Sequence, residues 1–264
     1  MSEEELINKS LNGDRKSLEQ LINSVRDSIF NIALRFLYSR EDAEDATQEI
    51  LIKIVTNLSK FKAESKFKTW TYRIATNYLT NLKKTKFEQK NISFDFYAND
   101  LKTFSAPKDY NLPDKDLLEK EMKTSCTLAM LQCLNREHRI AFILGSILKI
   151  KSNISAEITN TSPSNFRKRV EKSRKLLGNF MNNNCGVYNP KNPCRCNTRV
   201  NTGIKCGRIK KGNLQFSNDL KTYNEEMEEL HSLSGIYQNH GSFESKSSFN
   251  TQLNQLIASK KIMK

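Results

Sequence analysis

The segment Ser162–Leu177, SPSNFRKRVEKSRKLL, constrains the fold of this chain more than any other. Its apolar or small residues recur at helical spacing and share one face: Phe166, Val170, Ser173 and Leu177. The other faces carry six basic residues and one acid. Ser162 can cap such a helix, and Pro163 suits its first position. The sequence therefore predicts a basic helix that packs through one side only.

The residues just upstream favour a helix-turn-helix. Ile154–Ile158 is typical of a short helix, and Thr159–Thr161 of a tight turn. A short helix, a turn and a basic second helix make up a motif whose second helix enters the major groove of DNA. The spacing alone also fits a solvated charged helix, so both interpretations stay open at this point.

The distribution of charge favours a polyanionic partner. The formal net charge is +14 and the isoelectric point is near 9.5, which suits nucleic acid. Lys60–Lys90 holds nine basic residues against two acids, and Lys191–Gly212 holds seven with no acid. Arg40–Ile50 instead holds five acids and one Arg. Such changes of sign indicate separate surfaces for separate partners.

The length of 264 residues, with 37% hydrophobic content, allows cores for two small domains and an appendage. No apolar run is long enough to span a membrane, and the first residues, MSEEELINKS, are not a signal peptide. We therefore expect a soluble cytoplasmic protein without membrane insertion. In a reducing compartment its six Cys are not expected to form a permanent disulfide framework.

The N-terminal part predicts three helices. The first has the apolar stripe Leu18, Leu21, Ile22, Val25, Ile29, Ala33 and Leu34. Ser39–Asp42 is typical of a capping box for a second helix, which buries Ala43, Ala46, Ile50, Ile54 and Leu58 and carries acids in its first turns. The third has the stripe Phe67, Trp70, Ile74, Tyr78 and Leu82, flanked by Lys and Arg.

The periodicity fails from about Phe87 to Asp116, where Asp, Asn, Ser and Pro favour turns. A stretch of about thirty residues without a pattern is too long for an ordinary connection inside a compact domain. Helices resume at Leu117–Leu134 and Arg136–Ile150. We therefore expect an all-α fold of two small helical domains joined by a flexible linker, the second domain ending in the helix-turn-helix.

At this level of detail the chain resembles a known family. DAEDATQEILIKIVTNLSKF followed by FKTWTYRIATNYLTNLKK resembles the second conserved region of bacterial RNA polymerase sigma factors of the extracytoplasmic-function group, in the sigma-70 family. LNREHRIAFIL with the helix-turn-helix is similar to their fourth region. The family usually has a small residue where Thr159 stands, and a Gly in the turn. The resemblance implies region 2 at 5–86, a linker at 87–116, region 4 at 117–182 and a Cys-containing extension at 183–264.

The resemblance also implies a function without catalysis, namely promoter-specific transcription initiation. The partners that it implies are core RNA polymerase and promoter DNA, and it leaves an anti-sigma factor open as a third. The acidic helix would dock on polymerase through Asp42, Asp45, Gln48 and Glu49, by charge-assisted contacts with a basic site. Helix capping is the alternative role for these acids.

The basic-aromatic helix would hold melted DNA at the −10 element, because cations neutralise phosphates and aromatic faces stack on unpaired bases. An extruded base also needs a pocket. The candidates are Lys66, Lys68, Trp70, Tyr72, Arg73 and Asn77. Trp70 and Phe67 lie on the apolar stripe, which favours a core role, whereas Tyr72 and Arg73 lie off it and are better candidates for DNA contact.

The recognition helix would read the −35 element as duplex. Its early exposed residues would reach base edges: Ser164, Asn165, Arg167 and Lys168. Phosphate contacts that position the helix would come from Arg169, Lys172 and Arg174.

The extension holds Cys185, Cys194, Cys196 and Cys206 within a short segment rich in Gly and Pro. Four thiols there could bind one structural zinc; no other cofactor is expected to be required. The spacing lacks paired C-x2-C motifs, so reduced thiols, including a redox-sensitive one, are an equal alternative, although some family members carry a similar NPCRC tail. Cys126 and Cys133 lie in a helical stripe and are expected in the core. Leu220–Leu233 and Phe249–Ile262 predict short helices.

Two other functions stay open. An ordinary helix-turn-helix regulator would bind DNA without polymerase, but it would not need the acidic and basic-aromatic helices. A metal-dependent nuclease could use Asp42, Asp45 and Glu49 as ligands. No His or Lys base accompanies those acids, and an exposed helix is not a cleft.

Overall fold

The structure, a computed structural model, describes residues 2–103, 115–216, 233–238, 240, 242 and 243. Every regular element within these ranges is a helix, so the all-α prediction is confirmed for them. No described helix is long and apolar enough to cross a membrane.

The first half consists of α1 (Glu3–Leu11), α2 (Arg15–Leu37), α3 (Arg40–Thr56), a 3₁₀ turn η1 (Leu58–Lys60) and α4 (Phe67–Asn81). The predicted apolar stripes of α2 and α3 are buried throughout. Ser39 caps α3, since its hydroxyl accepts a hydrogen bond from the backbone N–H of Asp42 at 3.2 Å, which is the first of the two bonds of the predicted capping box. For these two helices, local spacing was sufficient to identify the buried face.

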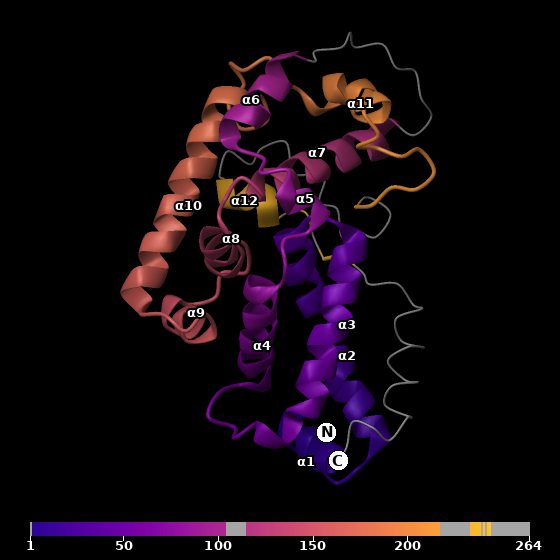
Figure 1. Ribbon diagram of the computed structural model, residues 1–264, viewed down its shortest axis with the longest axis vertical. Coiled ribbons are helices and arrows are strands. Elements are labelled where there is room, and N and C mark those ends of the chain that lie inside the picture. The colour runs from indigo at the N-terminus through magenta and orange to yellow at the C-terminus, as the bar shows by residue number, and fades with distance from the viewer. Residues whose placement is uncertain (1, 104–114, 217–232, 239, 241, 244–264) are drawn as a thin grey trace.

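The second half consists of α7 (Lys115–Leu131), α8 (Arg136–Phe142), a π-helical turn η2 (Ile143–Ile147), α9 (Ser152–Ile158) and α10 (Pro163–Asn184). In Figure 1, α10 runs along one side of the molecule, with α9 at its beginning. Gly145 lets η2 approach α10 closely, because a Cβ there would stand 2.8 Å from Val170 Cγ2.

Residues 87–103 are not the unstructured connection that the sequence predicts. Two short helices lie at this point, α5 (Lys86–Gln89) and α6 (Phe94–Thr103), while residues 104–114 fall outside the described part. Tyr97 of α6 is buried and stacks on Phe180 of α10, with 5.7 Å between ring centroids. The prediction failed because so short a helix is stabilised by tertiary packing and leaves little periodicity in the sequence.

Ion pairs join the start of this connection to the second half. Glu88 of α5 pairs with Arg136 at 2.6 Å and with Arg139 at 3.0 Å, both on α8. Burial raises the pKa of the Glu88 carboxyl, but the two guanidinium groups outweigh it, so the net shift is downward. The end of the first half is therefore fixed against α8 by a buried charge network.

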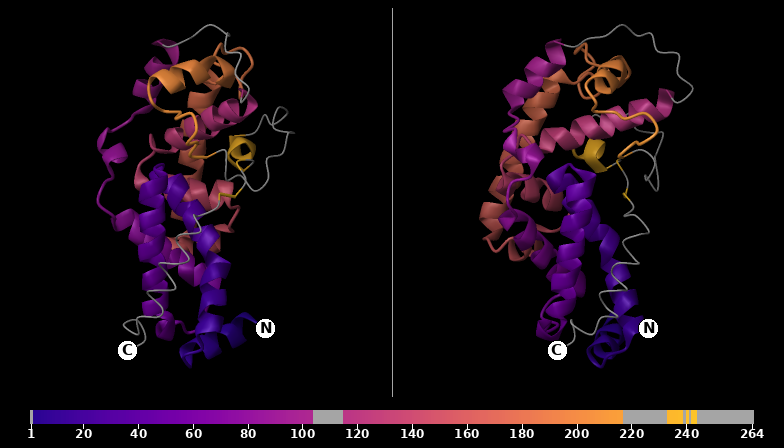
Figure 2. Two further views of the ribbon diagram at one scale, coloured as in Figure 1. Left: turned by 90° about the vertical axis from the view of Figure 1, so that its right-hand side faces the viewer. Right: turned by 45° about the vertical axis from the view of Figure 1, so that its right-hand side comes forward.

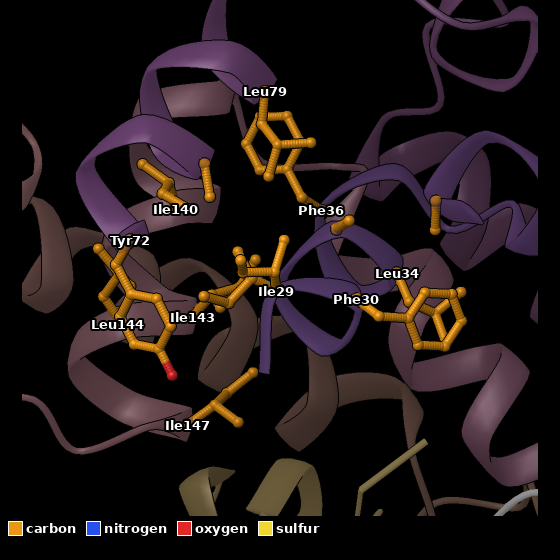
Figure 3. Close-up of a cluster of buried hydrophobic side chains, with 14 of the residues drawn as sticks. Ile29, Phe30, Leu34, Phe36, Tyr72, Leu79, Ile140, Ile143, Leu144 and Ile147 are labelled. Carbon is orange, nitrogen blue, oxygen red and sulfur yellow. The ribbon is translucent and has the colours of Figure 1, made fainter. Parts of the chain in front are cut away.

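The two helical units share one continuous core. Figure 3 shows side chains of α2 and α4 lying against those of α8 and η2: Ile29, Phe36, Tyr72, Leu79, Ile140, Ile143, Leu144 and Ile147. The helices of the first and second halves therefore meet in this structure, which the expected flexible linker did not imply.

The C-terminal extension contributes α11 (Cys196–Lys205) and α12 (Leu233–Gln238). α11 packs on α7, and both views in Figure 2 show α12, in yellow, below α7 and beside the ends of α2 and α3. The predicted helix Phe249–Ile262, and Leu220–Leu233 except for its last residue, lie outside the described residues.

Candidate nucleic-acid and protein interfaces

The start of α10 presents an exposed basic surface. Ser162 caps the helix as predicted, accepting from the N–H of Asn165 at 3.2 Å. The four residues expected to reach base edges are all exposed: Ser164, Asn165, Arg167 and Lys168. Opposite them, the predicted apolar face is buried against the rest of the second half. This arrangement can enter a DNA groove without disturbing the core.

The turn before α10 explains the missing glycine. Asn160 has φ of +49°, in the left-handed region that Gly usually occupies at such a turn. Asn tolerates this conformation better than most residues, because its short polar side chain bonds locally. The helix-turn-helix geometry is thus complete without Gly.

The three residues expected to hold phosphates differ in their surroundings. Lys172 and Arg174 are exposed, although Arg174 Nε also donates to Ser146 Oγ at 2.9 Å. Arg169 is half-buried and pairs with Glu137 at 2.9 Å. A phosphate would therefore have to compete with Glu137 for Arg169, while Lys172 needs no such exchange.

An open groove of about 680 Å³ runs between α3 and α4. Its lining combines cations, amides and aromatic rings: Lys53, Asn57, Lys60, Trp70, Ile74, Asn77, Tyr78, Asn81, Leu82 and Lys83. The Lys53 ammonium lies 5.8 Å from the centroid of the Tyr78 ring. Trp70 is half-buried and packs against Phe61 and Phe67, with centroids 5.4 and 5.7 Å away. Such a groove can take unpaired bases and their phosphates.

The structure buries one aromatic residue of α4 that the sequence favoured for DNA contact, and it places another, Trp70, both against the core and at the groove. Trp70, favoured as a core residue, lines the groove, while Tyr72, favoured for DNA contact, is only 5% exposed. Tyr72 lies against Leu144 and Ile143 of the second half (Figure 3). The correction has a tertiary cause, since the helices that cover Tyr72 come from a distant part of the sequence. Phe67 is buried, as expected.

Arg73 is also engaged by the second half. Its guanidinium forms an ion pair with Glu157 of α9, and both side chains keep partial exposure. Lys66, Lys68 and Asn77 are exposed, and Asn77 lines the groove. Of the six residues predicted for −10 DNA, the structure therefore gathers Trp70 and Asn77 in the groove and covers Tyr72.

The acidic face of α3 borders the same groove. Asp45 and Glu49 are exposed, and Asp42 and Gln48 are half-buried. Burial, followed by the charges of Glu49 and Asp45, raises the pKa of the Tyr78 hydroxyl. Asp45 and Glu49 thus lie about one helical turn apart on α3, beside a basic groove. Among the described residues, no three His, Cys, Asp or Glu side chains are grouped to hold a metal ion.

The four Cys predicted to share a zinc ion do not fit one site. Cys196 and Cys206 stand at opposite ends of α11, about 15 Å apart at 1.5 Å per residue. Cys206 is exposed, whereas Cys126 of α7 joins Cys185, Cys194 and Cys196 around a small apolar cavity of about 30 Å³. Burial raises the pKa of the Cys126 thiol to about 12. In the structure Cys206 therefore lies apart from the three other predicted thiols, which line this cavity together with Cys126.

Sequence reasoning missed several groove residues. Lys53, Asn57 and Lys60 come from α3 and its end, and Tyr78 and Lys83 come from α4 and just after it. A signal existed in the i, i+4 spacing of Trp70, Ile74 and Tyr78, which we interpreted as a core stripe. Only the packing of α3 against α4 shows that this face forms a groove.

Comparison with known proteins agrees with this geometry. Residues 21–87 match the family model described as Sigma-70 region 2, a range that includes the acidic face and every residue that lines the groove. The chain is similar to an ECF RNA polymerase sigma-E factor of Haemophilus influenzae, with 24% identity over 182 residues, 68% of this chain and 95% of that protein. It is also similar to the RNA polymerase sigma-H factor of Pseudomonas aeruginosa, with 25% identity over 66% of this chain and 91% of that protein. A third relative is the ECF RNA polymerase sigma factor SigW of Bacillus subtilis, at 25% identity over 62% and 89%.

Proposed function

We propose, from the premise that this chain belongs to the extracytoplasmic-function group of the sigma-70 family, that three surfaces divide the work of promoter-specific transcription initiation. The acidic face of α3 binds core RNA polymerase, the groove between α3 and α4 binds the −10 element, and the start of α10 reads the −35 element. This work takes place in the cytoplasm, where the polymerase is.

The observation that carries the proposal is the meeting of opposite charges on one helix pair. Asp45 and Glu49 present exposed carboxylates, while Lys53 and Lys60, further along the same segment, line the groove. A basic site on polymerase would be attracted to the acids and the DNA backbone to the lysines. A regulator that binds only duplex DNA would need neither surface.

The groove suits single-stranded DNA of the −10 element. Trp70 and Tyr78 offer aromatic rings for stacking, and Lys53, Lys60 and Lys83 offer charge for phosphates. Stacking is tolerant of base identity, so Asn57, Asn77 and Asn81 would supply the hydrogen bonds that discriminate bases. An extruded base fits this proposal, because the groove is open to solvent along its length.

The start of α10 suits duplex DNA of the −35 element. Arg167 can bond the O6 and N7 atoms of guanine, and Asn165 the N6 and N7 atoms of adenine. Lys168 and Ser164 flank them on the same exposed turn. Lys172 and Arg174, further along the helix, are placed for phosphates that set the register.

Catalysis, a required cofactor and a resident metal are not part of this proposal. An anti-sigma factor is included as a third partner on the family resemblance alone, and it would act by covering one of these surfaces.

Run-off transcription with purified core polymerase and genomic fragments tests the function. We expect discrete start sites that appear only when the protein is added, and co-purification of the protein with core enzyme. Equal transcripts without the protein, or no association with core enzyme, would contradict the proposal. Binding to duplex DNA without any association with polymerase would favour the ordinary regulator.

A further inference from the structure

The C-terminal extension is inserted where the two halves meet. Against the first half, Asn31 of α2 bonds both backbone groups of Phe243: its Nδ2 donates to the carbonyl at 2.8 Å, and its Oδ1 accepts from the N–H at 2.9 Å. The guanidinium of Arg35 lies 5.1 Å from the centroid of the Phe243 ring and donates to Asn31 Oδ1 at 2.7 Å. The side-chain amide of Asn31 therefore pairs with both backbone groups of Phe243, as the backbone of a neighbouring β-strand would.

The same segment also contacts the second half. The Tyr237 ring meets Phe142 of α8 edge to face, with 5.1 Å between centroids. Gln238 Nε2 donates to the carbonyl of Ser146 in η2 at 2.6 Å. His240 Nε2 and Thr127 Oγ1 of α7 form a hydrogen bond of 2.9 Å. This segment thus contacts α2 through Phe243, and α7, α8 and η2 through Tyr237, Gln238 and His240.

An earlier part of the extension makes a second bridge. The backbone N–H groups of Gln215 and Phe216 each donate to the buried carboxylate of Glu121 on α7, at 2.9 Å. Arg40, at the start of α3, donates to the carbonyl of Gln215 at 3.0 Å. The Phe216 ring then packs against Phe243, with 6.3 Å between centroids. Two segments of the extension, far apart in sequence, therefore meet in one cluster between the halves.

The closed arrangement that this cluster holds is incompatible with simultaneous contact to both promoter elements. The −10 and −35 elements lie about 25 base pairs apart, or roughly 85 Å of duplex at 3.4 Å per pair. In the structure α4 packs directly against α9, and Arg73 pairs with Glu157 across that contact. Neighbouring helices are only about 10 Å apart. The halves must therefore separate before one molecule can occupy both elements.

We propose that Phe216, Tyr237, His240 and Phe243 form an intramolecular clasp that keeps the free protein closed, and that the clasp opens when the protein binds polymerase and promoter. This inference rests on the proposed function only where it says that the clasp inhibits binding to polymerase and promoter. The clasp itself is a contact between parts of this chain, and it can be measured without DNA or polymerase.

The chemistry of the clasp suits release. Tyr237 Oη and His240 Nδ1 are buried without a hydrogen-bond partner in the described part of the chain. Buried polar atoms in this condition destabilise the closed state relative to one in which water reaches them. The interior of the α2–α3 pair, by contrast, is formed largely by apolar side chains. The clasp is therefore expected to open before either half unfolds.

The test uses the full chain with Tyr237→Ala and Phe243→Ala, and with Lys211→Ala at an exposed tail position as the matched control. Hydrogen–deuterium exchange of α4 and α9, with the radius of gyration from small-angle X-ray scattering, reports opening. We expect faster exchange in both helices and a larger radius for the two clasp variants, and neither change for the control.

Binding to core polymerase then reports inhibition. If only the open form binds, the apparent affinity falls with the fraction that is open, so the clasp variants should bind core enzyme at least about threefold more tightly than the unchanged protein. Variants that stay closed and folded would overturn the clasp. Variants that open but bind core enzyme no more tightly would overturn its inhibitory role. If no version binds core enzyme, the proposed function fails, while the opening result still decides the clasp.

A surface variant guards against loss of folding in the clasp variants. Glu157→Lys removes the pair with Arg73 without touching the core, and it should also speed exchange in α4 and α9. The charge swap Arg73→Glu with Glu157→Arg should restore protection. If the exchange rates of α4 and α9 are the same in both variants as in the unchanged protein, the two helices do not meet in solution. This result would overturn the closed state.

Discussion

The acidic face of α3 and the neighbouring surface of α4 differ in how much of each the free protein exposes. Asp45 and Glu49 of α3 are exposed. On α4, Tyr72 is buried under the second half and Arg73 is paired with Glu157. The surface proposed to meet polymerase is therefore available in the closed protein, while part of the surface expected to meet DNA is covered. The difference implies that a first contact through α3 can precede opening, while full binding to polymerase and contact with DNA need the open form.

The largest expected effect concerns the exposed acidic face of α3. Asp45→Lys with Glu49→Lys should weaken binding to core polymerase by several kcal/mol, about 100-fold or more, because attraction to a basic site becomes repulsion. Pull-down and titration with core enzyme measure the loss, and circular dichroism checks the fold. Glu4→Lys with Glu64→Lys, two exposed acids outside α3, is the matched control and should bind normally. Normal binding by the α3 variant would reduce its acids to helix capping.

The next prediction separates the two aromatic residues of α4. Tyr72→Ala should lower the free energy of unfolding by about 3 kcal/mol, since it removes a buried ring from the contact between the halves. Trp70→Ala should cost less stability but weaken binding of −10 single strands by about 1–3 kcal/mol, through lost stacking. Denaturant unfolding and fluorescence anisotropy, with holoenzyme for the DNA measurement, separate the two effects. A loss of DNA affinity at unchanged stability in Tyr72→Ala, with the reverse in Trp70→Ala, would restore the assignment made from the sequence.

A third prediction extends the comparison to α10, whose DNA-reading side chains are exposed. Arg167→Ala should weaken binding to −35 duplex by about 1–3 kcal/mol and relax specificity at one base pair. Lys172→Ala should weaken binding to all sequences alike and reduce the salt dependence. Binding to a set of base-substituted duplexes measures both. A uniform loss for Arg167→Ala would instead identify a phosphate contact.

The stability of the closed state, which covers part of α4, should depend on pH through His240 of the clasp. Burial, and then the charges of Arg35 on α2 and Lys123 on α7, lowers the pKa of His240 to about 3; Tyr237 and Thr127 also lie against it. The closed state holds His240 in its neutral form. The free energy that favours closure therefore has its full value above the ordinary histidine pKa near 6.5. It weakens by about 1.4 kcal/mol per unit as pH falls toward 3, or roughly 2 kcal/mol at pH 5.

Exchange of α12 amides, corrected for the intrinsic rate at each pH, measures this effect between pH 7.5 and pH 5. His240→Gln keeps a donor for Thr127 but cannot titrate, and it should remove most of the pH dependence. If the pH dependence persists in His240→Gln, other titratable groups between the two halves must cause it.

The smallest effect concerns how the extension is attached to α7. Cys126→Ser places a hydroxyl at an apolar cavity and should lower the free energy of unfolding by about 1–3 kcal/mol. Cys206→Ser, at an exposed position, should change it by less than about 0.5 kcal/mol. Thermal unfolding compares the pair. Elemental analysis of both variants tests the position of Cys206. One equivalent of zinc that is lost in Cys206→Ser would mean that Cys206 lies with the other thiols, contrary to the structure.

Short-range patterns identified the helices whose neighbours are close in sequence. The stripes of α2 and α3, the caps at Ser39 and Ser162, and the one-sided packing of α10 follow from spacing and from local hydrogen bonds. Their function was reached through the resemblance of the same segments to a family. These features were accessible because each depends on residues within a few turns of one another.

Tertiary structure alone decided the remainder. α6 is held by Asp100, whose carboxylate pairs with Arg208 at 2.6 Å and Arg199 at 3.0 Å in the extension, about a hundred residues away. Tyr72 is buried because the second half covers it, while Trp70, which also packs against the core, lines the groove. Phe243 contacts α2 through the side chains of Asn31 and Arg35. In each instance the deciding partner is distant in sequence, and the periodicity of a helix records that one face is buried without recording what buries it.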